Sequence, residues 1–551
     1  MLIFWAAIFL PGLGSTEIKG EEGRRILPAV TMLEEGNWLV PYVGGKPFLR
    51  KPPLINWLIA ASFKISGTRN EWSARMPSAL AVLALALTIV ASSNGRGWIN
   101  AETGFMAAIF AMTQFGLLAK ARFAGAEIEG VYAPLSGLAI VTWLAWWHQR
   151  RSPWLTWTIP FVFLGLAALA KGPSLHLLFF YAVVFATLWS KRQWRRLIHP
   201  AHFAGVAIAT AIFAAWAIPF FHSPETLDAA AVWKRQGIDR FTESDFNAAN
   251  FFLNIPRGLM DQLPWLLLTP LLIAQLRKTK ESAPEPADPE AHLNTRFLRS
   301  LTFTIATCFF GLLLVPGVLP RYLLPLGTPF ALLLALSLTR GAPNERALRI
   351  WHKVHLVLGT LLMAGALASP LIAGAAPGGR GVGDALRHLD FARAVPAALV
   401  ASVAIGLCAL VVARRPVALR PRELVMASGT LCAAASMLYA IAAVPWINRA
   451  DNLRPLAAQI DAAIPPGKKL FVFDPGYAAV LFYLRHPFQY VIGSGSLPPG
   501  AEFVLAREQS RRKLPEDRTG LVVTHTFSSG KERERFLLLQ PRERISNHPT
   551  P

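Results

Sequence analysis

The chain has 551 residues, of which 53% are hydrophobic and only 16% are charged. Soluble domains carry about 25% charged residues, and here the apolar residues fall in runs of about 17–24, the length that crosses a bilayer. This composition excludes a soluble enzyme, a disordered chain and a disulfide-stapled secreted domain. The net charge of +22 favours cytoplasmic loops that face anionic lipid, so we expect no nucleic-acid partner.

The first apolar run covers residues 2–13. No Lys or Arg precedes it and no small-residue cleavage pattern follows it, which disfavours a cleaved signal peptide. About 13 residues are marginal for a complete span, so either neighbouring residues complete the helix or the true start lies upstream. We interpret this run as the first transmembrane helix.

Further apolar runs bring the predicted total to about thirteen transmembrane helices, and the expected fold is an all-α polytopic membrane protein. They lie at roughly 76–92, 102–119, 130–147, 154–170, 174–190, 203–221, 259–276, 299–316, 322–339, 354–375, 394–413 and 424–446. The three cysteines, Cys308, Cys408 and Cys432, lie inside these runs without ligand-like spacing. We therefore expect small core residues, and neither metal clusters nor disulfides.

Alternate connections between the runs are rich in Lys and Arg. They contain Arg96; Arg150 and Arg151; Lys191, Arg192, Arg195 and Arg196; Arg277, Lys278 and Lys280; Arg340, Arg346, Arg349 and Lys353; and Arg414, Arg415, Arg420 and Arg422. The positive-inside rule places all six connections in the cytoplasm. The N-terminus is then cytoplasmic, and the segments 15–75, 222–257 and 447–551 lie outside the membrane.

The last segment divides the chain into a transmembrane domain over 1–446 and an outer domain over 447–551. Its pattern predicts strands at 468–474, 489–493 and 520–527 and a helix at 477–484. No Gly-rich phosphate loop follows the first strand, because the sequence at 474–476 is the turn Asp-Pro-Gly. We expect a small α/β domain that is structural or handles the acceptor.

Charged residues stand out in the first outer loop, where the positive-inside rule would deplete cations. Glu21 and Glu22 precede Arg24 and Arg25. The next stretch can form an amphipathic helix in the plane of the interface, with Ile26, Val30 and Leu33 on one face, before Pro52 and Pro53 break the chain beside Lys51. The alternative is a solvated interfacial helix whose cations contact lipid phosphates.

Further charges lie at the outer ends of later runs. They are Lys120, Arg122, Glu127 and Glu129 in the connection 120–130, then Lys171 and Arg321, which precedes Tyr322, and Arg240 lies in the outer segment 222–257. Snorkelling explains Lys120, but carboxylates near a bilayer are costly unless they are paired. Cations that converge with two carboxylate pairs in an outer cavity would suit a phosphate-bearing lipid. No HExxH, Walker loop, GxSxG or CxxC pattern occurs.

These residues resemble the ArnT/PMT-type glycosyltransferases of the GT-C fold, which include the lipid A aminoarabinose transferase and protein O-mannosyltransferases. GEEGRR at 20–25 and GNWLVPYVGGKPFLRKPPLINW at 36–57 resemble the family's first periplasmic loop. RFAGAEIEG, AKGP and RYLLP, at 122–130, 170–173 and 321–325, resemble later family segments. The similarity covers about residues 10–340, and the remainder matches mainly in layout.

The resemblance implies transfer of a sugar from a polyprenyl monophosphate carrier to lipid A, lipopolysaccharide or another envelope glycan, at the periplasmic face of a bacterial inner membrane. It places Glu21 at the catalytic first-loop Asp, with Glu22 beside it, and Glu129 at the second-loop acid, with Glu127 as the alternative. The donor phosphate would be bound by Lys51, Arg24, Arg122, Lys171, Arg240, Arg321 and Tyr322. No nucleotide sugar is expected at the site.

Three departures from the family pattern bear on the chemistry. Glu replaces Asp at Glu21, Arg25 stands where the aminoarabinose transferases have Tyr, and Arg50 stands where they have Glu. That Glu can contact a metal, so its loss leaves Glu21 as the residue that would hold a divalent ion, if one binds. The added positive charge hints at an acidic sugar or a more anionic acceptor.

We expect an inverting displacement at the anomeric carbon, with Glu21 or Glu129 orienting or deprotonating the acceptor hydroxyl. An acceptor that is itself a phosphate needs no base. A protein O-mannosyltransferase-like enzyme is the nearest alternative, followed by a lipid-linked sugar flippase and a structural scaffold. Acids are nearly absent from the spans and we find no inverted repeat, which favours the enzyme over a transporter. A monomer is expected.

Overall fold

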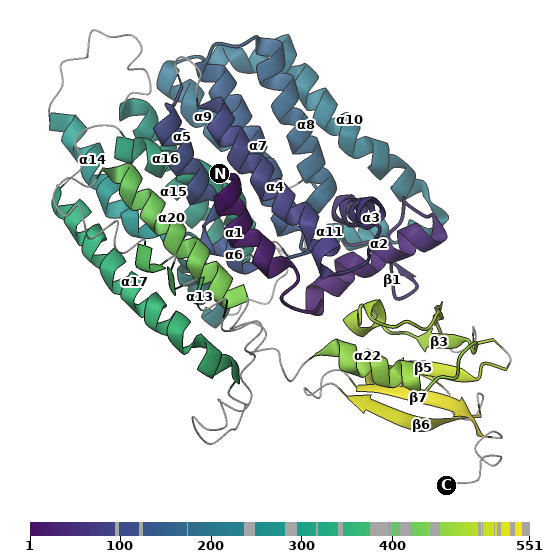
Figure 1. Ribbon diagram of the computed structural model, residues 1–551. Coiled ribbons are helices and arrows are strands. Elements are labelled where there is room, and N and C mark those ends of the chain that lie inside the picture. The colour runs from purple at the N-terminus through teal and green to yellow at the C-terminus, as the bar shows by residue number, and fades with distance from the viewer. Residues whose placement is uncertain are drawn as a thin grey trace.

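The computed structural model describes residues 1–93, 98–120, 125–173, 175–235, 248–281, 295–315, 318–339, 345–374, 420–440, 452–493, 500–511, 520–528 and 535–542, with short pieces between these ranges. Helices dominate up to residue 438, and a sheet follows (Figure 1). Seven described helices are long and apolar enough to cross a membrane. The predicted polytopic helical fold is confirmed at this level.

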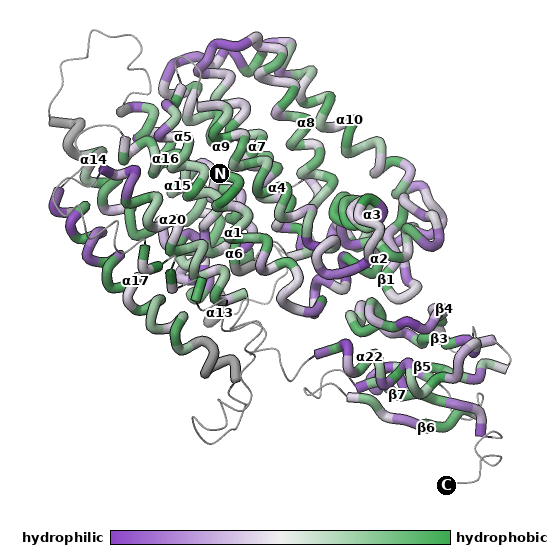
Figure 2. The backbone as a smooth tube through the Cα atoms, in the orientation of Figure 1, coloured by the Kyte–Doolittle hydropathy of each residue, from purple (hydrophilic) through white to green (hydrophobic). Residues whose placement is uncertain are grey.

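The first half of the chain forms a row of packed helices. They are α1 (Leu2–Leu13), α2 (Gly23–Glu35), α3 (Leu54–Ser66), α4 (Glu71–Ser92), α5 (Ala101–Met112), α6 (Phe115–Lys120), α7 (Glu129–His148), α8 (Pro153–Lys171), α9 (Leu175–Lys191), α10 (Pro200–His222) and α11 (Ala229–Lys234). Helix α7 contacts α4 and α8. Of its most apolar 18-residue stretch 83% is buried, compared with 22% for the corresponding stretch of α10. Helix α7 is therefore at the centre of the bundle, and α10 presents apolar residues outward (Figure 2).

The second half adds helices to the other side of the bundle. They are α13 (Ala248–Met260), α14 (Thr269–Glu281), α15 (Thr295–Leu313), α16 (Gly327–Thr339), α17 (Glu345–Gly374) and α20 (Pro421–Leu438), with the 3-10 turn η6 (Pro320–Leu326) before α16. The expected run 102–119 is divided between α5 and α6, and 259–276 is divided between α13 and α14. The expected span 394–413 lies largely outside the described residues.

The first outer loop forms two helices that run across the long helices at one end of the bundle (Figure 1). Helix α2 is the predicted amphipathic helix, and Ile26 on its apolar face is fully buried. Pro53 precedes α3, as expected from the broken chain at this point. Between them, β1 (Tyr42–Val43) and β2 (Lys46–Pro47) form a short hairpin.

The C-terminal segment forms a five-stranded mixed sheet in the order β4-β3-β5-β7-β6. Its members are β3 (Leu470–Phe473), β4 (Phe488–Val491), β5 (Phe503–Arg507), β6 (Leu521–Ser528) and β7 (Arg535–Pro541), with α22 (Leu453–Ala462) before them and the short α23 (Glu508–Arg511) after β5. Strand β3 pairs in parallel with β4 and β5, whereas β7 is antiparallel to β5 and β6. Three strands were predicted, but the predicted helix 477–484 is wrong, because only the 3-10 turn η9 (Ala479–Phe482) forms there.

The sheet unit is docked on the first outer loop through polar contacts. The Tyr483 hydroxyl donates to Glu71 Oε1 (2.9 Å) and accepts from the Ile18 amide (2.6 Å), and Arg454 Nη2 donates to both Glu71 oxygens (2.7 and 2.9 Å). Lys46 Nζ lies 2.5 Å from Asp474 Oδ1. These contacts join residues 383 to 465 positions apart, so the loop and the sheet unit form one layer.

Gly44 is expected to be essential for this docking. Its φ is +59°, and an added Cβ would lie 2.5 Å from the Gly476 carbonyl oxygen. Gly44→Ala should therefore lower the free energy of unfolding by roughly 1–3 kcal/mol through backbone strain, with the clash in addition. Gly67→Ala is the control, because Gly67 has a φ of +67° but nothing within 4 Å. Equal losses of thermal stability in detergent would show that the contact with Gly476 does not matter.

The Asp474 ion pairs give the docking a pH dependence. Burial alone would raise the pKa of Asp474, but the ammonium groups of Lys46 and Lys513 hold it below its ordinary value. Their stabilising contribution is complete above the unfolded carboxyl pKa of about 3.9 and is lost as the pH falls through the lower folded value. Thermal unfolding followed from pH 6 to pH 3 should show this loss in the native chain and less of it in Asp474→Asn. Parallel curves would contradict the assignment.

Candidate active site

Glu22 lies at the base of the site in a buried ion pair. Its side chain is 0% exposed, and its two oxygens accept from Arg75 Nε and Nη2, both at 2.8 Å. Arg75 Nη1 also donates to the Leu13 and Thr16 carbonyls at 2.7 and 2.8 Å. The pair therefore ties the first loop to the start of α4 and to the end of α1.

Glu21, one residue earlier, faces a different environment. Its side chain is 41% exposed, and Oε2 accepts from Arg24 Nη1 at 2.9 Å. The Arg24 guanidinium carbon lies 4.1 Å from the centroid of the Tyr477 ring, which belongs to the sheet unit. The 3-10 turn η1 (Gly20–Glu22) thus separates two adjacent carboxylates, so that Glu22 points into the protein and Glu21 remains accessible.

Arg25 is a buried cation of the same loop. It is 8% exposed, its guanidinium carbon lies 5.5 Å from the Phe48 ring centroid, and its Nε is buried without a hydrogen-bond partner. Burial lowers the pKa of Arg25, and the negative charges of Glu127, Glu129 and Glu21 oppose that effect. Sequence reasoning noted Arg25 only as a departure from the family and did not place it in the site, although a charged residue in place of Tyr was the available signal.

A second cluster forms where α7, α8 and η6 meet. Glu129 Oε1 lies 3.2 Å from Lys171 Nζ and 3.7 Å from Arg321 Nε. Lys171 Nζ is also 4.7 Å from the Tyr132 ring centroid and 4.6 Å from that of Tyr322. Residues from three separate segments, all predicted from the sequence except Tyr132, are thus brought together around one buried carboxylate.

The two clusters are neighbours. The Ala126 amide donates to Glu22 Oε1 at 3.0 Å, and this hydrogen bond joins the connection before α7 to the first loop. Arg25 interacts electrostatically with Glu21 on one side and with Glu127 and Glu129 on the other. The loop between α1 and α3, the start of α7 and the end of α8 therefore contribute to one charged site.

The remaining predicted residues have different outcomes. Lys51 is half-buried just before α3, and the Leu49 carbonyl near it accepts from Trp233 Nε1 at 2.7 Å, so α11 packs against this part of the loop. Glu127 is half-buried beside Glu129. Arg122 and Arg240 lie outside the described residues, so the structure does not place them.

A divalent metal does not fit the charged site as described. No group of three His, Cys, Asp or Glu side chains gathers anywhere in the described part of the chain. Glu21, the residue expected to hold such an ion, has Arg24 as its partner at 2.9 Å. Arg24, Lys171 and Arg321 lie beside the carboxylates of the site, and these cations favour the binding of an anion over a metal.

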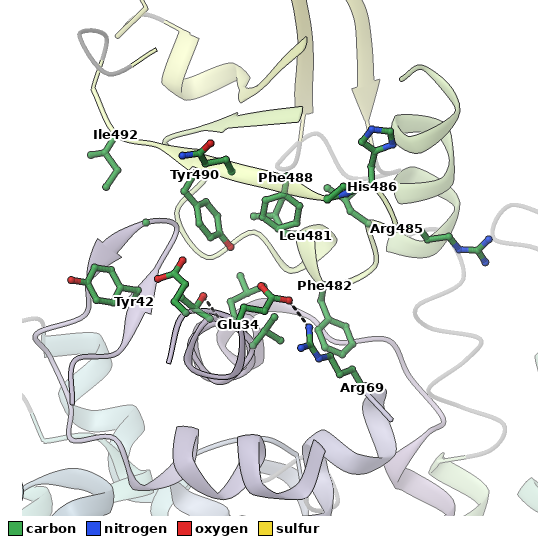
Figure 3. Close-up of a pocket in the computed structure, with 18 residues that line it drawn as sticks. Glu34, Tyr42, Arg69, Leu481, Phe482, Arg485, His486, Phe488, Tyr490 and Ile492 are labelled. Atoms are coloured by element: carbon green, nitrogen blue, oxygen red, sulfur yellow. Dashed lines mark hydrogen bonds and ion pairs between the residues drawn. The ribbon is translucent and has the colours of Figure 1, made fainter. Parts of the chain in front are cut away.

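A pocket of about 660 Å³ lies between α2, largely its C-terminal half, and the sheet unit (Figure 3). Glu34, Tyr42 and Arg69 line it from the loop, and Phe488 and Tyr490 line it from the sheet. Burial and the nearby carboxylates of Glu34 and Glu35 raise the pKa of Tyr490. None of the predicted site residues lines this pocket.

Comparison with known proteins gives sequence matches to one group. A family model described as dolichyl-phosphate-mannose-protein mannosyltransferase matches residues 50–218. The undecaprenyl phosphate-alpha-4-amino-4-deoxy-L-arabinose arabinosyl transferase of Pseudomonas aeruginosa (strain LESB58) is 27% identical over 354 residues, which cover 62% of this chain and 60% of that protein. A Pseudomonas fluorescens (strain Pf0-1) relative of the same description is 27% identical over 66% of this chain and 63% of its own. The chain thus spans about three fifths of the curated relatives that it matches.

Solved structures match over nearly the whole chain. ArnT from Cupriavidus metallidurans bound to undecaprenyl phosphate is 18% identical, with a TM-score of 0.67 over 98% of this chain and 96% of that chain. The same protein in its apo state gives a TM-score of 0.68. At this identity the match shows the fold. Together with the sequence matches, it confirms the resemblance to ArnT/PMT-type proteins that the motifs predicted.

Proposed function

We propose that this chain, an ArnT/PMT-type protein by fold and sequence similarity, is an integral membrane glycosyltransferase. Its donor would be a sugar on an undecaprenyl-type polyprenyl monophosphate, and its acceptor lipid A, lipopolysaccharide or another envelope glycan. The observation that carries the proposal is the buried Glu129–Lys171–Arg321 cluster beside the accessible Glu21. Cations for a phosphate and a carboxylate for an acceptor are thus available in one site.

The proposed topology keeps about thirteen spans, a cytoplasmic N-terminus and a periplasmic sheet unit. The charged site, α2, α3 and the sheet unit lie at the same end of the bundle (Figure 1). The connections near Arg150 and Arg192, which the positive-inside rule assigns to the cytoplasm, lie at the other end. Gram-negative relatives support an inner-membrane location.

The donor phosphate would bind at the second cluster. Lys171 Nζ and Arg321 Nε lie 3.2 and 3.7 Å from Glu129 Oε1, so two cations are available there to a phosphate. The Tyr322 ring packs beside Lys171 and would limit its movement. Lys51 and Arg24 would add positive charge from the first loop, and Arg122 and Arg240 remain proposed contacts by resemblance. The polyprenyl chain would stay in the bilayer while its phosphate enters from the side.

The carboxylates would have separate tasks. Glu21 is accessible and would orient or deprotonate the acceptor hydroxyl. Glu22 is fully buried with Arg75, so it would position the loop that carries Glu21. Glu129 would hold Lys171 and Arg321 in place, and Glu127, half-buried next to it, is the alternative second-loop acid.

The reaction would be a single displacement with inversion. The acceptor oxygen forms a bond to the anomeric carbon as the bond from that carbon to the phosphate oxygen breaks. The bonding electrons pass to the polyprenyl phosphate, whose growing charge Lys171 and Arg321 stabilise. The hydroxyl proton passes to Glu21, whereas a phosphate acceptor has no proton to remove and needs Glu21 only for orientation.

Two other functions remain as alternatives. The family model that matches residues 50–218 favours a protein O-mannosyltransferase-like enzyme with a protein acceptor. A flippase for lipid-linked sugars is less favoured, because transporters place ionisable groups near the bilayer midplane and these clusters lie at one end of the bundle.

Deletion of the gene, followed by mass spectrometry of total lipids, tests the proposed donor and acceptor. We expect a polyprenyl-phosphate sugar to accumulate and the matching sugar to disappear from lipid A, lipopolysaccharide or another glycan. Loss of mannose from proteins instead would favour the protein acceptor. If neither pool changes, the glycosyltransferase proposal fails and transport becomes the leading interpretation.

Lys171→Ala should lower kcat/KM for the donor at least about tenfold. It removes a cation that pairs with Glu129 at 3.2 Å, and truncating one partner of a buried charge pair costs about 2–5 kcal/mol. Transfer kinetics at varied donor concentration provide the measurement. Lys64→Ala, at the exposed end of α3, is the control and should behave as the native chain. Equal donor kinetics in the two variants would remove Lys171 from the donor site.

A further inference from the structure

The turn Asp474–Tyr477 is the part of the sheet unit that lies closest to the first turn of α2. Asp474 pairs with Lys46 at 2.5 Å, and Gly476 packs against Gly44 of the β1–β2 hairpin. A Cβ added at Gly23 would lie 2.9 Å from the Tyr477 carbonyl oxygen. Glycines on the loop side therefore let the two backbones approach closely, and this approach fixes where the Tyr477 side chain lies.

Tyr477 reaches the charged site through Arg24. Its ring centroid is 4.1 Å from the Arg24 guanidinium carbon, well within the range of a cation–π contact. The same guanidinium donates to Glu21 Oε2 at 2.9 Å. The side chains of Arg24 and Glu21 are 19% and 41% exposed, and Tyr477 is half-buried over them. A continuous row, Tyr477–Arg24–Glu21, thus leads from the sheet unit to the accessible carboxylate.

We propose that Tyr477 is a positioning residue for the transfer reaction, which acts on Glu21 through Arg24. This inference rests on the proposed function of Glu21 and gives the sheet unit a part in the reaction. A partly exposed Arg–Glu pair three residues apart is held weakly by itself. The Tyr477 ring lies 4.1 Å from the guanidinium carbon, so it limits the movement of Arg24 and thereby fixes the direction of the Glu21 carboxylate.

Steady-state kinetics of the full-length protein test the positioning role. Tyr477→Leu should lower kcat by about 10- to 100-fold with little change in the donor KM, because small misplacements of a reacting group have effects of this size. Tyr477→Phe should retain most of the native kcat, because it keeps the ring that contacts Arg24. Equal kcat in Tyr477→Leu and the native chain would overturn the proposal.

A double-mutant cycle separates positioning from simple loss of packing. If Tyr477 acts through Arg24, Tyr477→Leu should cause little further loss of kcat in an Arg24→Gln background. Full additivity would overturn the proposal. Tyr490→Leu is the matched control, because Tyr490 also comes from the sheet unit and faces α2, but it lines the pocket at the other end of that helix (Figure 3).

A readout that needs no transfer activity distinguishes this inference from the proposed function. The ¹⁹F resonance of 3-fluorotyrosine at position 477 should shift in Arg24→Gln and also in Glu21→Gln, because both changes alter the row next to the ring. Unshifted resonances would overturn the row even where transfer is observed. Shifted resonances in a protein that transfers no sugar would keep the row and overturn the proposed function, and with it the catalytic part of this inference.

Discussion

Glu22→Ala is expected to destabilise the protein by about 3–5 kcal/mol, the usual result of breaking a buried ion pair from one side. The substitution leaves Arg75, which is 1% exposed, without the carboxylate that accepts both of its 2.8 Å bonds. It also removes the acceptor of the Ala126 amide. The free energy of unfolding in detergent, or the thermal midpoint of the purified protein, measures the effect.

The matched control is Glu34→Ala on the same outer layer. Glu34 pairs with Arg69 at 2.5 Å, but their side chains are 56% and 44% exposed. Exposed pairs contribute about 0–1 kcal/mol, so this variant should unfold close to the native midpoint. If Glu22→Ala were as stable as Glu34→Ala, the buried pair would not hold the first loop.

Glu21→Gln is expected to lower kcat by about 10²- to 10⁴-fold while leaving stability unchanged, the range that a general acid–base group contributes. The change removes a proton acceptor but keeps the size of the side chain, and Glu21 is 41% exposed and pairs with Arg24. Transfer of sugar from a polyprenyl-phosphate donor to a hydroxyl acceptor measures it. A phosphate acceptor should show a much smaller loss, because no proton is removed.

Glu35→Gln is the control for this prediction. Glu35 lies on the same helix, α2, but at the end that lines the pocket. Its transfer rate should equal that of the native chain. A similar loss in both variants would indicate a general effect of charge on the loop, and native activity in Glu21→Gln would exclude Glu21 as the base.

Much of the site could be predicted from sequence because charged residues are rare near the apolar runs of this chain, where a charge is costly unless it is paired. Lys171, Arg321 and Glu129 come from segments far apart, and each stood out as a charged residue at the end of an apolar run. In the structure, Lys171 Nζ lies 3.2 Å and Arg321 Nε lies 3.7 Å from Glu129 Oε1. The amphipathic pattern likewise predicted α2, whose apolar face is buried at Ile26.

Other features depend on three-dimensional contacts that no local pattern reveals. Glu22 and Glu21 are adjacent in the sequence, so their separation into a buried and an accessible carboxylate follows only from the turn that carries them. Arg75 was not singled out, although an Arg at the outer start of an apolar run was an available signal. The contact of Tyr477 with Arg24 joins residues more than 450 positions apart. The helix predicted at 477–484 was wrong, and it gave no reason to place Tyr477 in the site.

Transfer of a sugar from a polyprenyl phosphate by the charged site can be tested directly in vitro. We would incubate the purified full-length protein with a panel of undecaprenyl-phosphate-linked sugars and lipid A, and follow both lipids by mass spectrometry. We expect glycosylated lipid A and free undecaprenyl phosphate in equal amounts for at least one donor, with both products reduced in Lys171→Ala. Donors that bind the protein and cross vesicle membranes, with no product on lipid A, other glycans or protein, would contradict sugar transfer by this site.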